Sequence, residues 1–303
     1  MPALICGSLA FDTITNFHGH FAQQILPEQV HILNVSFLVP TLRREYGGCA
    51  GNIAYTHKAL GGEPIIMATL GSDGQDYRAR LQALGLDLSC VRSIDHNYTA
   101  QAIIITDESN NQITAFHPGA MGEAHLTPVP AKRSDIRLGI IAPDGRDAMI
   151  VHAQQLHSAG IPFIFDPGQG LPMFNGDELK AFVQQATWVA VNDYEARMLA
   201  ERTGQSIESL SRSHLQGVVV TLGAEGCEVW VQGVRTHVPG HQATEVVDPT
   251  GCGDAFRAAL LYGLEHGWPL QRCVELGNRI GAIKIAHRGG QNHPVDRVAL
   301  GLS

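Results

Sequence analysis

Residues 248–256, Asp-Pro-Thr-Gly-Cys-Gly-Asp-Ala-Phe, combine a carboxylate with two glycines just before a helical pattern at 255–266. Gly251 and Gly253 let the backbone turn so that the free N–H groups at the helix start, aided by the helix dipole, bind an anion without a lysine. Asp254 would repel a phosphate there, unless it takes a proton from an attacking hydroxyl. The segment therefore predicts either phosphoryl transfer with Asp254 as base or, as is commoner for an isolated motif of this kind, an Asp that only caps the helix.

Two further glycine clusters lie at residues 47–52 and 221–226. The first leads into a helical pattern, and its simplest interpretation is a tight loop with Asn52 as helix cap. The second follows an apolar strand and precedes another strand-like run, as an ordinary glycine turn does. Neither cluster by itself establishes a binding site.

Other routes to phosphate, nucleotide and metal binding are missing from the sequence. The four lysines are Lys58, Lys132, Lys180 and Lys284, and none follows a glycine, so there is no GxxxxGK[ST] phosphate loop. No GxGxxG fingerprint occurs, and no two of the six cysteines form a CxxC pair that would indicate zinc or redox chemistry.

Composition limits the class of protein. With 303 residues, 44% hydrophobic and 17% charged, the chain is expected to be globular. A net charge of -8 argues against a nucleic-acid partner, which needs a basic face. No apolar run approaches the roughly 18 to 20 residues that span a bilayer, so no membrane partner is expected. Scattered cysteines without a signal peptide favour a cytoplasmic protein.

Short apolar runs alternate with helical patterns along most of the chain. The predicted strands are 64–70, 138–142, 162–165, 188–191 and 217–222, and the predicted helices are 52–60, 77–84, 144–158, 194–202 and 255–266. This alternation is typical of buried parallel strands joined by helices. The fold class is therefore α/β, with a doubly wound, mostly parallel sheet flanked by helices.

Two stretches interrupt this alternation. Residues 13–46 carry short alternating segments, and 99–106 with 112–117 suggest a hairpin around the polar turn 107–111. Strands from both places could pair into a small sheet that forms a lid over a pocket. An antiparallel edge of the main sheet explains the pattern equally well.

Taken in order, these segments resemble the PfkB, or ribokinase-like, carbohydrate kinase family over nearly the whole chain. Residues 47–52 match its N-terminal glycine signature, and Asn192-Asp193-Tyr194-Glu195 matches its Asn-x-x-Glu element. Residues 248–256 match its more specific C-terminal signature. The resemblance implies a core of residues 1–12, 47–97 and 118–303, with a β lid of residues 13–46 and 98–117.

The resemblance also implies roles in phosphoryl transfer. Asp254 would be the catalytic base, and the amides of Gly251, Cys252 and Gly253 would form an anion hole. Asn192 and Glu195 would hold Mg²⁺, through water, which Mg²⁺ surrenders reluctantly. Further positions would bind the nucleotide or a monovalent cation: Thr221, Gly223 and Gly226 in the ATP channel, Asn278 and Ala282 at the adenine, and Asp248 and Thr250 at the cation, expected to be K⁺.

On the acceptor side, the resemblance gives Asp12 the task of accepting hydrogen bonds from two sugar hydroxyls, as the two oxygens of a carboxylate can. Without the family, Asp12 reads as part of a surface turn. Gly47, Gly48 and Asn52 would complete the ribose pocket. The family often pairs through its lids, so a homodimer is a further expectation.

The lid region favours a nucleoside as acceptor. Phe116 would stack on a nucleobase and Met121 would adapt to it, and Arg257 matches the bacterial adenosine-kinase-like members. Phe11, Phe17 and Phe37 could add apolar surface for a base, or could equally serve lid packing or a dimer contact.

The predicted function is transfer of the γ-phosphoryl group of ATP to a ribose 5′-hydroxyl of a nucleoside such as adenosine. The alternatives are a ribokinase or other sugar kinase, and a non-catalytic nucleoside-binding protein. The chain departs from the family at 166–169, Asp-Pro-Gly-Gln, so Gln169 receives no role.

Overall fold

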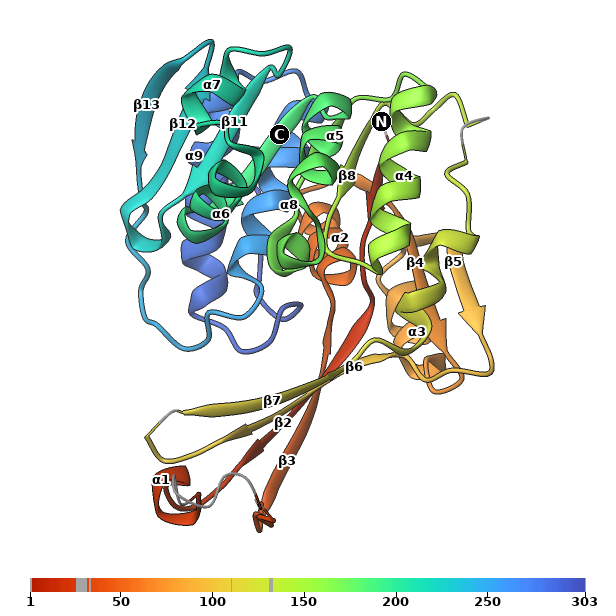
Figure 1. The fold of residues 1–303 in the computed structure, drawn as a ribbon, viewed down its shortest axis with the longest axis vertical. Helices are drawn as coiled ribbons and strands as arrows, with labels where there is room; N and C mark the ends of the chain where they lie inside the picture. The colour runs from red at the N-terminus through yellow and green to blue at the C-terminus, as the bar shows by residue number, and fades with distance from the viewer. Residues whose placement is uncertain (1, 26–31, 33, 110, 131–132, 303) are drawn as a thin grey trace.

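The computed structural model describes residues 2–25, 32, 34–109, 111–130 and 133–302 and contains two separate sheets (Figure 1). The larger has nine strands in the order β13-β12-β11-β10-β9-β8-β1-β4-β5. These strands are β1 (Pro2–Cys6), β4 (Glu63–Gly71), β5 (Asp87–Ile94), β8 (Leu138–Ile141), β9 (Phe163–Phe165), β10 (Trp188–Asn192), β11 (Gly217–Thr221), β12 (Gly226–Val231) and β13 (Val234–Pro239). All neighbours from β5 to β11 pair in parallel, and β12 and β13 add an antiparallel edge.

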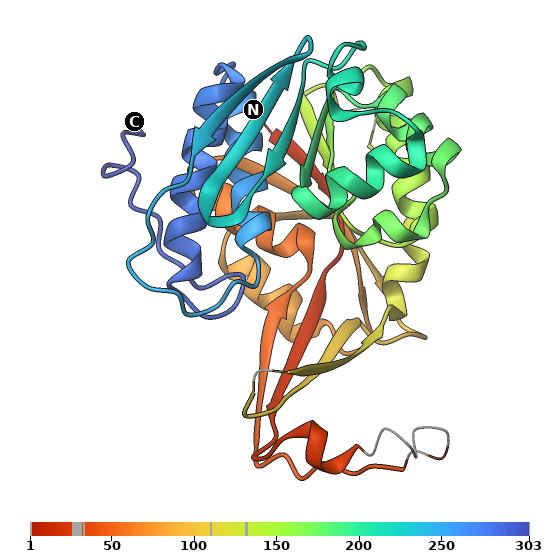
Figure 2. The ribbon, with the colours of Figure 1, turned by 60° about the vertical axis from the view of Figure 1, so that its left-hand side comes forward.

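Helices cover both faces of the large sheet, as Figure 1 and Figure 2 show. Successive strand residues point to opposite faces, so Ile5 packs in one apolar cluster while its neighbours Leu4 and Cys6 pack in the other. One cluster includes side chains of α2 (Cys49–Ala59), α3 (Gln75–Ala83), α8 (Cys252–Glu265) and α9 (Leu270–Ile285). The other includes side chains of α4 (Arg146–Ser158), α5 (Gly176–Gln185), α6 (Asp193–Thr203) and α7 (Ile207–Ser211). This is the predicted doubly wound fold.

The smaller sheet has four strands in the order β3-β2-β6-β7 and is not an edge of the large sheet. Its strands are β2 (Ala10–Asn16), β3 (Thr41–Gly47), β6 (Ala100–Thr106) and β7 (Gln112–His117), and α1 (Phe21–Gln24) lies between β2 and β3. The sheet projects from one end of the core (Figure 2). The lid limits of 13 and 46 cut through its strands, because β2 begins at Ala10 and β3 ends at Gly47. Residues 26–31, 33 and 110 of the predicted lid lie outside the described residues.

Two helices begin three residues before their predicted starts. Gly48 precedes α2 with φ 85°, and Gly251 precedes α8 with φ 78°. Glycine adopts this left-handed region without a Cβ penalty, so the chain turns into each helix immediately after the glycine. Asn52 and Asp254 therefore lie inside their helices and cap neither of them.

None of the helices within the described residues has both the length and the apolar character that spanning a bilayer requires.

Candidate active site

The candidate site lies at the carboxyl ends of the parallel strands, where the direction of winding reverses. β1 is flanked by β4 on one side and β8 on the other. In open α/β sheets a crevice forms outside the carboxyl ends of strands at such a switch point. Ser8 follows β1 here, and its hydroxyl accepts a hydrogen bond from the Cys49 amide at 3.2 Å, which fixes the start of α2 beside the switch point.

A chain of hydrogen bonds holds Asp254. The Asn52 side-chain amide donates to Asp254 Oδ2 at 2.8 Å, and Gln291 Nε2 donates to Asn52 Oδ1 at 3.2 Å. Gln291 Nε2 also donates to the Tyr77 hydroxyl at 2.5 Å, and that hydroxyl donates to Gly47 O at 2.6 Å. Because Gln291 occupies the oxygen of the Asn52 amide, its NH₂ group is the part that faces Asp254. The Cys49 side chain is a second hydrogen-bond partner of Asp254.

The two carboxyl groups of Asp254 and Asp12 both have pKa values raised to about 6. Burial raises the pKa of Asp254 to about 6; Asp166 acts in the same direction, and the Asn52 hydrogen bond and Arg257 oppose it. Burial, followed by repulsion from Asp254 and Asp248, raises the pKa of Asp12 to about 6. The negative charge of Asp254 thus contributes to the raised pKa of Asp12, so the two predicted functional carboxylates interact electrostatically.

The start of α8 has the geometry of an anion site. Gly251 adopts the left-handed conformation, and the position where Gly253 would carry a Cβ is open, with no atom within 4 Å. The Gly253 N–H has no backbone acceptor among the described residues. The Cys252 N–H, in contrast, donates to Pro249 O at 3.1 Å. Cys252 was predicted to line the anion hole with its amide, and that donor is already used in turning the chain into the helix.

Asn192 and Glu195 form a capping box at the start of α6. The Asn192 side-chain oxygen accepts from the Glu195 amide at 2.7 Å, and the Glu195 carboxylate accepts from the Asn192 backbone and side-chain nitrogens at 2.8 and 2.9 Å. Burial and the neighbouring Asp166 raise the pKa of Glu195. Each carboxylate oxygen keeps a further lone pair, so water-mediated binding of Mg²⁺ fits this donor set.

A buried ion pair joins Arg257 and Asp166, and no sequence motif predicted it. Arg257, which is 4% exposed, donates from Nη2 to Asp166 Oδ1 at 3.2 Å. Its Nε and Nη1 have no partner among the described residues. The Arg257 charge acts on Asp254 and Glu195 as well as on Asp166. Arg257 is thus a buried cation at the centre of the site with two donors unused.

The predicted nucleotide-binding residues lie along β11, β12 and α9. Thr221 ends β11 and its hydroxyl donates to Val191 O at 3.4 Å, and Gly223 follows in an open position. Gly226 has a purely structural need for glycine, since a Cβ there would lie 2.2 Å from Val238 O. Asn278 donates to Pro239 O at 2.9 Å. Ala282 lies one turn further along α9 on the same face.

The predicted cation-binding residues Asp248 and Thr250 take part in hydrogen bonds within the protein. Asp248 Oδ1 accepts from the Thr250 amide and Oδ2 from the Gly289 amide, both at 2.9 Å. Burial acts to raise the pKa of Asp248, but these two amides outweigh it and hold the pKa below its ordinary value. The Lys284 ammonium donates to the backbone oxygen of Asp248 at 2.7 Å. A cation of the protein itself, the Lys284 ammonium, thus lies beside the predicted K⁺ site.

The small sheet presents acceptor-binding candidates on one face. Glu45, Asp12, Ala102 and Phe116 are successive partners across β3, β2, β6 and β7, so their side chains share a face. Phe116 is 53% exposed on this face. Met121 lies in the half-buried 3₁₀ helix η2 (Gly119–Leu126) that follows β7.

The other lid aromatics pack among themselves and do not join this face. Phe11 is adjacent to Asp12 in β2 and so points to the opposite face, where it lies 5.5 Å from the ring of Tyr77. Phe17 and Phe37 pack 5.0 Å apart beside Phe21. Of the two roles considered for these side chains, packing is the one the structure supports.

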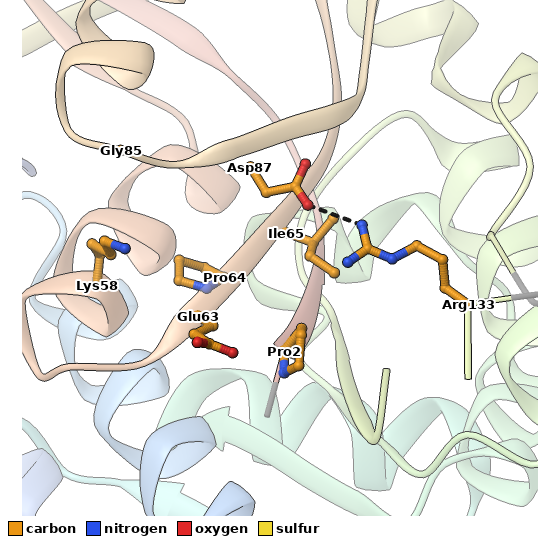
Figure 3. Close-up of a pocket in the computed structure, with 8 residues that line it drawn as sticks. All are labelled: Pro2, Lys58, Glu63, Pro64, Ile65, Gly85, Asp87 and Arg133. Carbon is orange, nitrogen blue, oxygen red and sulfur yellow. Dashed lines mark hydrogen bonds and ion pairs between the residues drawn. The ribbon is translucent and has the colours of Figure 1, made fainter. Parts of the chain in front are cut away.

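A pocket at the other end of the large sheet is separate from this site (Figure 3). It is lined by Pro2, Lys58, Glu63, Pro64, Ile65, Gly85, Asp87 and Arg133. Pro2 and Glu63 are the first residues of β1 and β4, so the pocket lies at the amino ends of these strands. The Arg133–Asp87 ion pair, at 2.9 Å, crosses it. None of the predicted site residues lines it.

Comparison with known proteins identifies the family. The sequence profile described as pfkB family carbohydrate kinase matches residues 19–297. The chain belongs to this family. The family and the ribokinase-like fold predicted from the sequence are both confirmed, and the protein is a phosphotransferase with an alcohol group as acceptor.

Several relatives resemble this pfkB kinase over nearly its whole length. A Burkholderia thailandensis nucleoside kinase in complex with inosine is 48% identical, with a TM-score of 0.87 over 98% of this chain and 94% of that one. The same protein in complex with ADP-inosine gives 49% identity and a TM-score of 0.85 over 98% and 92% of the two chains. The Methanocaldococcus jannaschii nucleoside kinase gives 25% identity and a TM-score of 0.89 over 99% and 96%.

Sequence reasoning missed the residues that support the site from a distance. Gln291, Tyr77 and Lys284 act through contacts with segments far away in the sequence. Arg257 was noted for its match to the adenosine-kinase-like members, but its partner Asp166 was not identified. A charged residue among apolar ones, as at Arg257 and Lys284, is the local signal that could have drawn attention to both.

Proposed function

We propose that the protein is an ATP-dependent nucleoside kinase that transfers the γ-phosphoryl group to the ribose 5′-hydroxyl of a nucleoside such as adenosine or inosine. The observation that carries the proposal is the pairing of Asp254, at the open start of α8, with Asp12 and Phe116 on one face of the small sheet. Relatives that cover nearly the whole chain and are themselves nucleoside kinases support it.

Asp254 serves as the base. A pKa of about 6 leaves the carboxylate ionised at neutral pH, yet basic enough to accept a proton as the hydroxyl attacks phosphorus. The hydrogen bond from Asn52 to Oδ2 orients the carboxylate so that Oδ1 meets the hydroxyl. The proton ends on Asp254 and the phosphoryl group on the ribose oxygen, while ADP leaves.

Charge on the transferring group is balanced by the chain around it. The free Gly253 amide and the positive end of the α8 dipole face the place where negative charge develops. Arg257 adds a buried positive charge with two unused donors. Mg²⁺, held through water by Glu195 and Asn192, would neutralise the β- and γ-phosphates.

The acceptor is recognised by the small sheet. Asp12 binds two ribose hydroxyls, with Gly47, Gly48 and Asn52 beside it. A Cβ on Gly47 would lie 2.5 Å from Asp12 Oδ2, so this glycine leaves the carboxylate room. Phe116 lies two strands away from Asp12 on the same face, about 10 Å at ordinary strand spacing. That separation suits a ribose at Asp12 and a base stacked on Phe116, with Met121 beside it.

ATP binds on the other side of Asp254, along Thr221, Gly223 and Gly226, with its adenine near Asn278 and Ala282. The small sheet then acts as a lid that excludes water, so that ATP is not hydrolysed in place of transfer. The functional lid consists of β2, β3, β6 and β7, and the remaining chain is the core.

The test is ATP consumption by the purified protein with Mg²⁺ against adenosine, inosine, cytidine, ribose and fructose. Nucleosides should support turnover and free sugars should not, and Asp254→Asn should abolish it. A preference for free sugars would keep the chemistry but refute the nucleoside acceptor. Binding of nucleosides without any turnover would leave only a binding protein.

A further inference from the structure

Lys284 is buried completely, at 0% exposure, in the last turn of α9. Its ammonium group donates to two backbone oxygens, Asp248 O at 2.7 Å and His287 O at 3.0 Å. Lysine is almost never fully buried unless it is paired, so its place here requires a compensating role. Asp248 lies in the segment that leads into α8, and His287 lies just after the end of α9.

These partners are the kind that a monovalent cation takes. Backbone carbonyl oxygens replace the hydration shell of K⁺, and they equally accept hydrogen bonds from an ammonium group. The Asp248 carboxylate, the anionic group expected to complete a K⁺ site, has both oxygens bonded to the amides of Thr250 and Gly289. The carbonyl oxygens Asp248 O and His287 O are thus already bonded to Lys284, and K⁺ does not fit alongside its ammonium group.

The position of Lys284 connects it to the site. The amides of Val247 and Asp248 both donate to Ile285 O, so the chain entering the anion loop is fixed to the end of α9. Burial lowers the pKa of Lys284, and nearby negative charge, including Asp248 and Asp254, opposes that shift. The ammonium therefore interacts with the catalytic carboxylate as well as with the loop that precedes α8.

The segment after Lys284 also reaches Asp254. Gly290 packs so closely on Asn52 that a Cβ would lie 2.3 Å from its Oδ1, and Gln291 donates to the same oxygen. Lys284 binds His287 at the start of this segment and Asp248 at the start of the anion loop. One side chain thus fixes the two segments that place the Gly253 amide and orient Asn52.

We propose that the Lys284 ammonium takes the place of the monovalent cation expected for this site, so that the catalytic loop is organised without K⁺. Lys284 acts as a positioning residue, through the carbonyls of Asp248 and His287. This inference rests on the proposed kinase function for its activity readout, but its binding and stability readouts are independent of that function.

The experiment compares the full-length wild type with Lys284→Ala and Lys284→Met in potassium, sodium or tetramethylammonium chloride at equal ionic strength. Nucleoside phosphorylation and the thermal unfolding midpoint are measured in each salt. Lys284→Ala opens a space bounded by carbonyl oxygens, which K⁺ can enter. Lys284→Met removes the charge but fills the space. Lys58→Ala, which removes an exposed lysine, is the matched control.

For the wild type and the Lys58→Ala control, we expect equal rates and equal midpoints in all three salts. In tetramethylammonium, the kcat of Lys284→Ala should be about 10²-fold below that of the wild type, because the loss of one preorganised charge has effects of this size. In K⁺, the kcat of the same variant should be about tenfold higher than in tetramethylammonium. K⁺ should raise its unfolding midpoint in the same samples, since a ligand that binds only the folded state stabilises it. Lys284→Met should be impaired in every salt.

Saturable stimulation of the wild type by K⁺ over tetramethylammonium would overturn the proposal, as would full activity of Lys284→Met without K⁺. If Lys284→Ala does not fold, the wild type and Lys284→Met still decide the question. If no nucleoside is phosphorylated, the proposed function fails, and the cation dependence of the unfolding midpoints tests the Lys284 inference alone.

Discussion

The two sheets differ in how their faces are covered. The large sheet has helices on both faces, and central strands such as β1, β8 and β11 are apolar almost without interruption. The small sheet leaves large apolar side chains in solvent: Leu42 is 67% exposed and Phe116 53%. The groups that we propose for catalysis in the core are therefore fixed by packing on both sides, whereas one face of the proposed lid is open to a ligand. Changes in the core should affect kcat, and changes in the lid should affect KM.

The sharpest test of the preassembled core is Asp254→Asn. We expect kcat to fall about 10³-fold or more, because a positioned base contributes typically 10²–10⁴-fold. KM for the nucleoside should change little. The folded state should gain about 1 to 2 kcal/mol at pH 7, since the substitution removes a buried carboxylate whose pKa is raised to about 6. Steady-state kinetics and thermal unfolding measure the two effects. A stable variant with normal kcat would contradict the role of Asp254.

Gln291→Leu tests whether the support behind Asn52 matters. Without Gln291, the Asn52 amide loses the partner that turns its NH₂ group toward Asp254. We expect kcat to fall about tenfold, as when a hydrogen bond to a charged group is lost. The acid limb of the pH–rate profile should move to higher pH, because the Asn52 hydrogen bond lowers the pKa of Asp254.

Gln271→Leu is the matched control, because Gln271 is exposed on α9 and its side chain donates to Glu275, also on the surface of that helix. Its kcat and its acid limb should equal those of the wild type. A loss of kcat in Gln291→Leu without any movement of the acid limb would indicate a merely structural role for Gln291.

Activity should fall with pH below about 6. Asp254 must be ionised to accept a proton, and Asp12 must be ionised to accept two hydrogen bonds; the pKa of each is raised to about 6. Log kcat/KM should therefore decline with a slope steeper than one. These two groups do not weaken the fold in this range: a carboxyl whose folded pKa exceeds its unfolded value gains stability as pH falls. Circular dichroism over the same pH range separates loss of activity from unfolding.

The smallest expected effect lies in the lid. Phe116→Ala should raise KM for nucleosides about fivefold to tenfold by removing a stacking contact worth about 1 kcal/mol, and kcat should stay within twofold. Ile113→Ala is the control, because residues 113 and 116 of one strand point to opposite faces. Equal KM values for the two variants would refute base stacking on this face.

The sequence predicted the core better than the site. Strands such as 217–221 are short, apolar and bounded by turns, so their type follows from local pattern. The start of α8 was missed by three residues, because a positive φ at Gly251 is not visible in residue type alone. The family signatures named Asp254 and Asn52, but not the contact between them.

The supporting residues escaped prediction for a physical reason. Tyr77, Gln291 and Asn52 are joined by hydrogen bonds between positions that are far apart in the sequence. Phe11 was considered for base contact, but its place beside Asp12 in a strand sends it to the other face. Lys284 had no motif around it, and only the fold brings it to Asp248.

The connections between lid and core are short. Three residues separate β1 from β2, and Gly48 alone separates β3 from α2. A Cβ on Gly48 would lie 2.5 Å from Ser8 O, so the two connections are also pressed against each other. Asp12 lies just beyond this hinge on the lid and Asn52 just beyond it on the core. The lid strand β2 and the helix α2 are thus joined to the core through neighbouring, tightly packed connections. Any movement of the lid relative to the core must take place at residues 7–9 and at Gly48, next to Asp12 and Asn52.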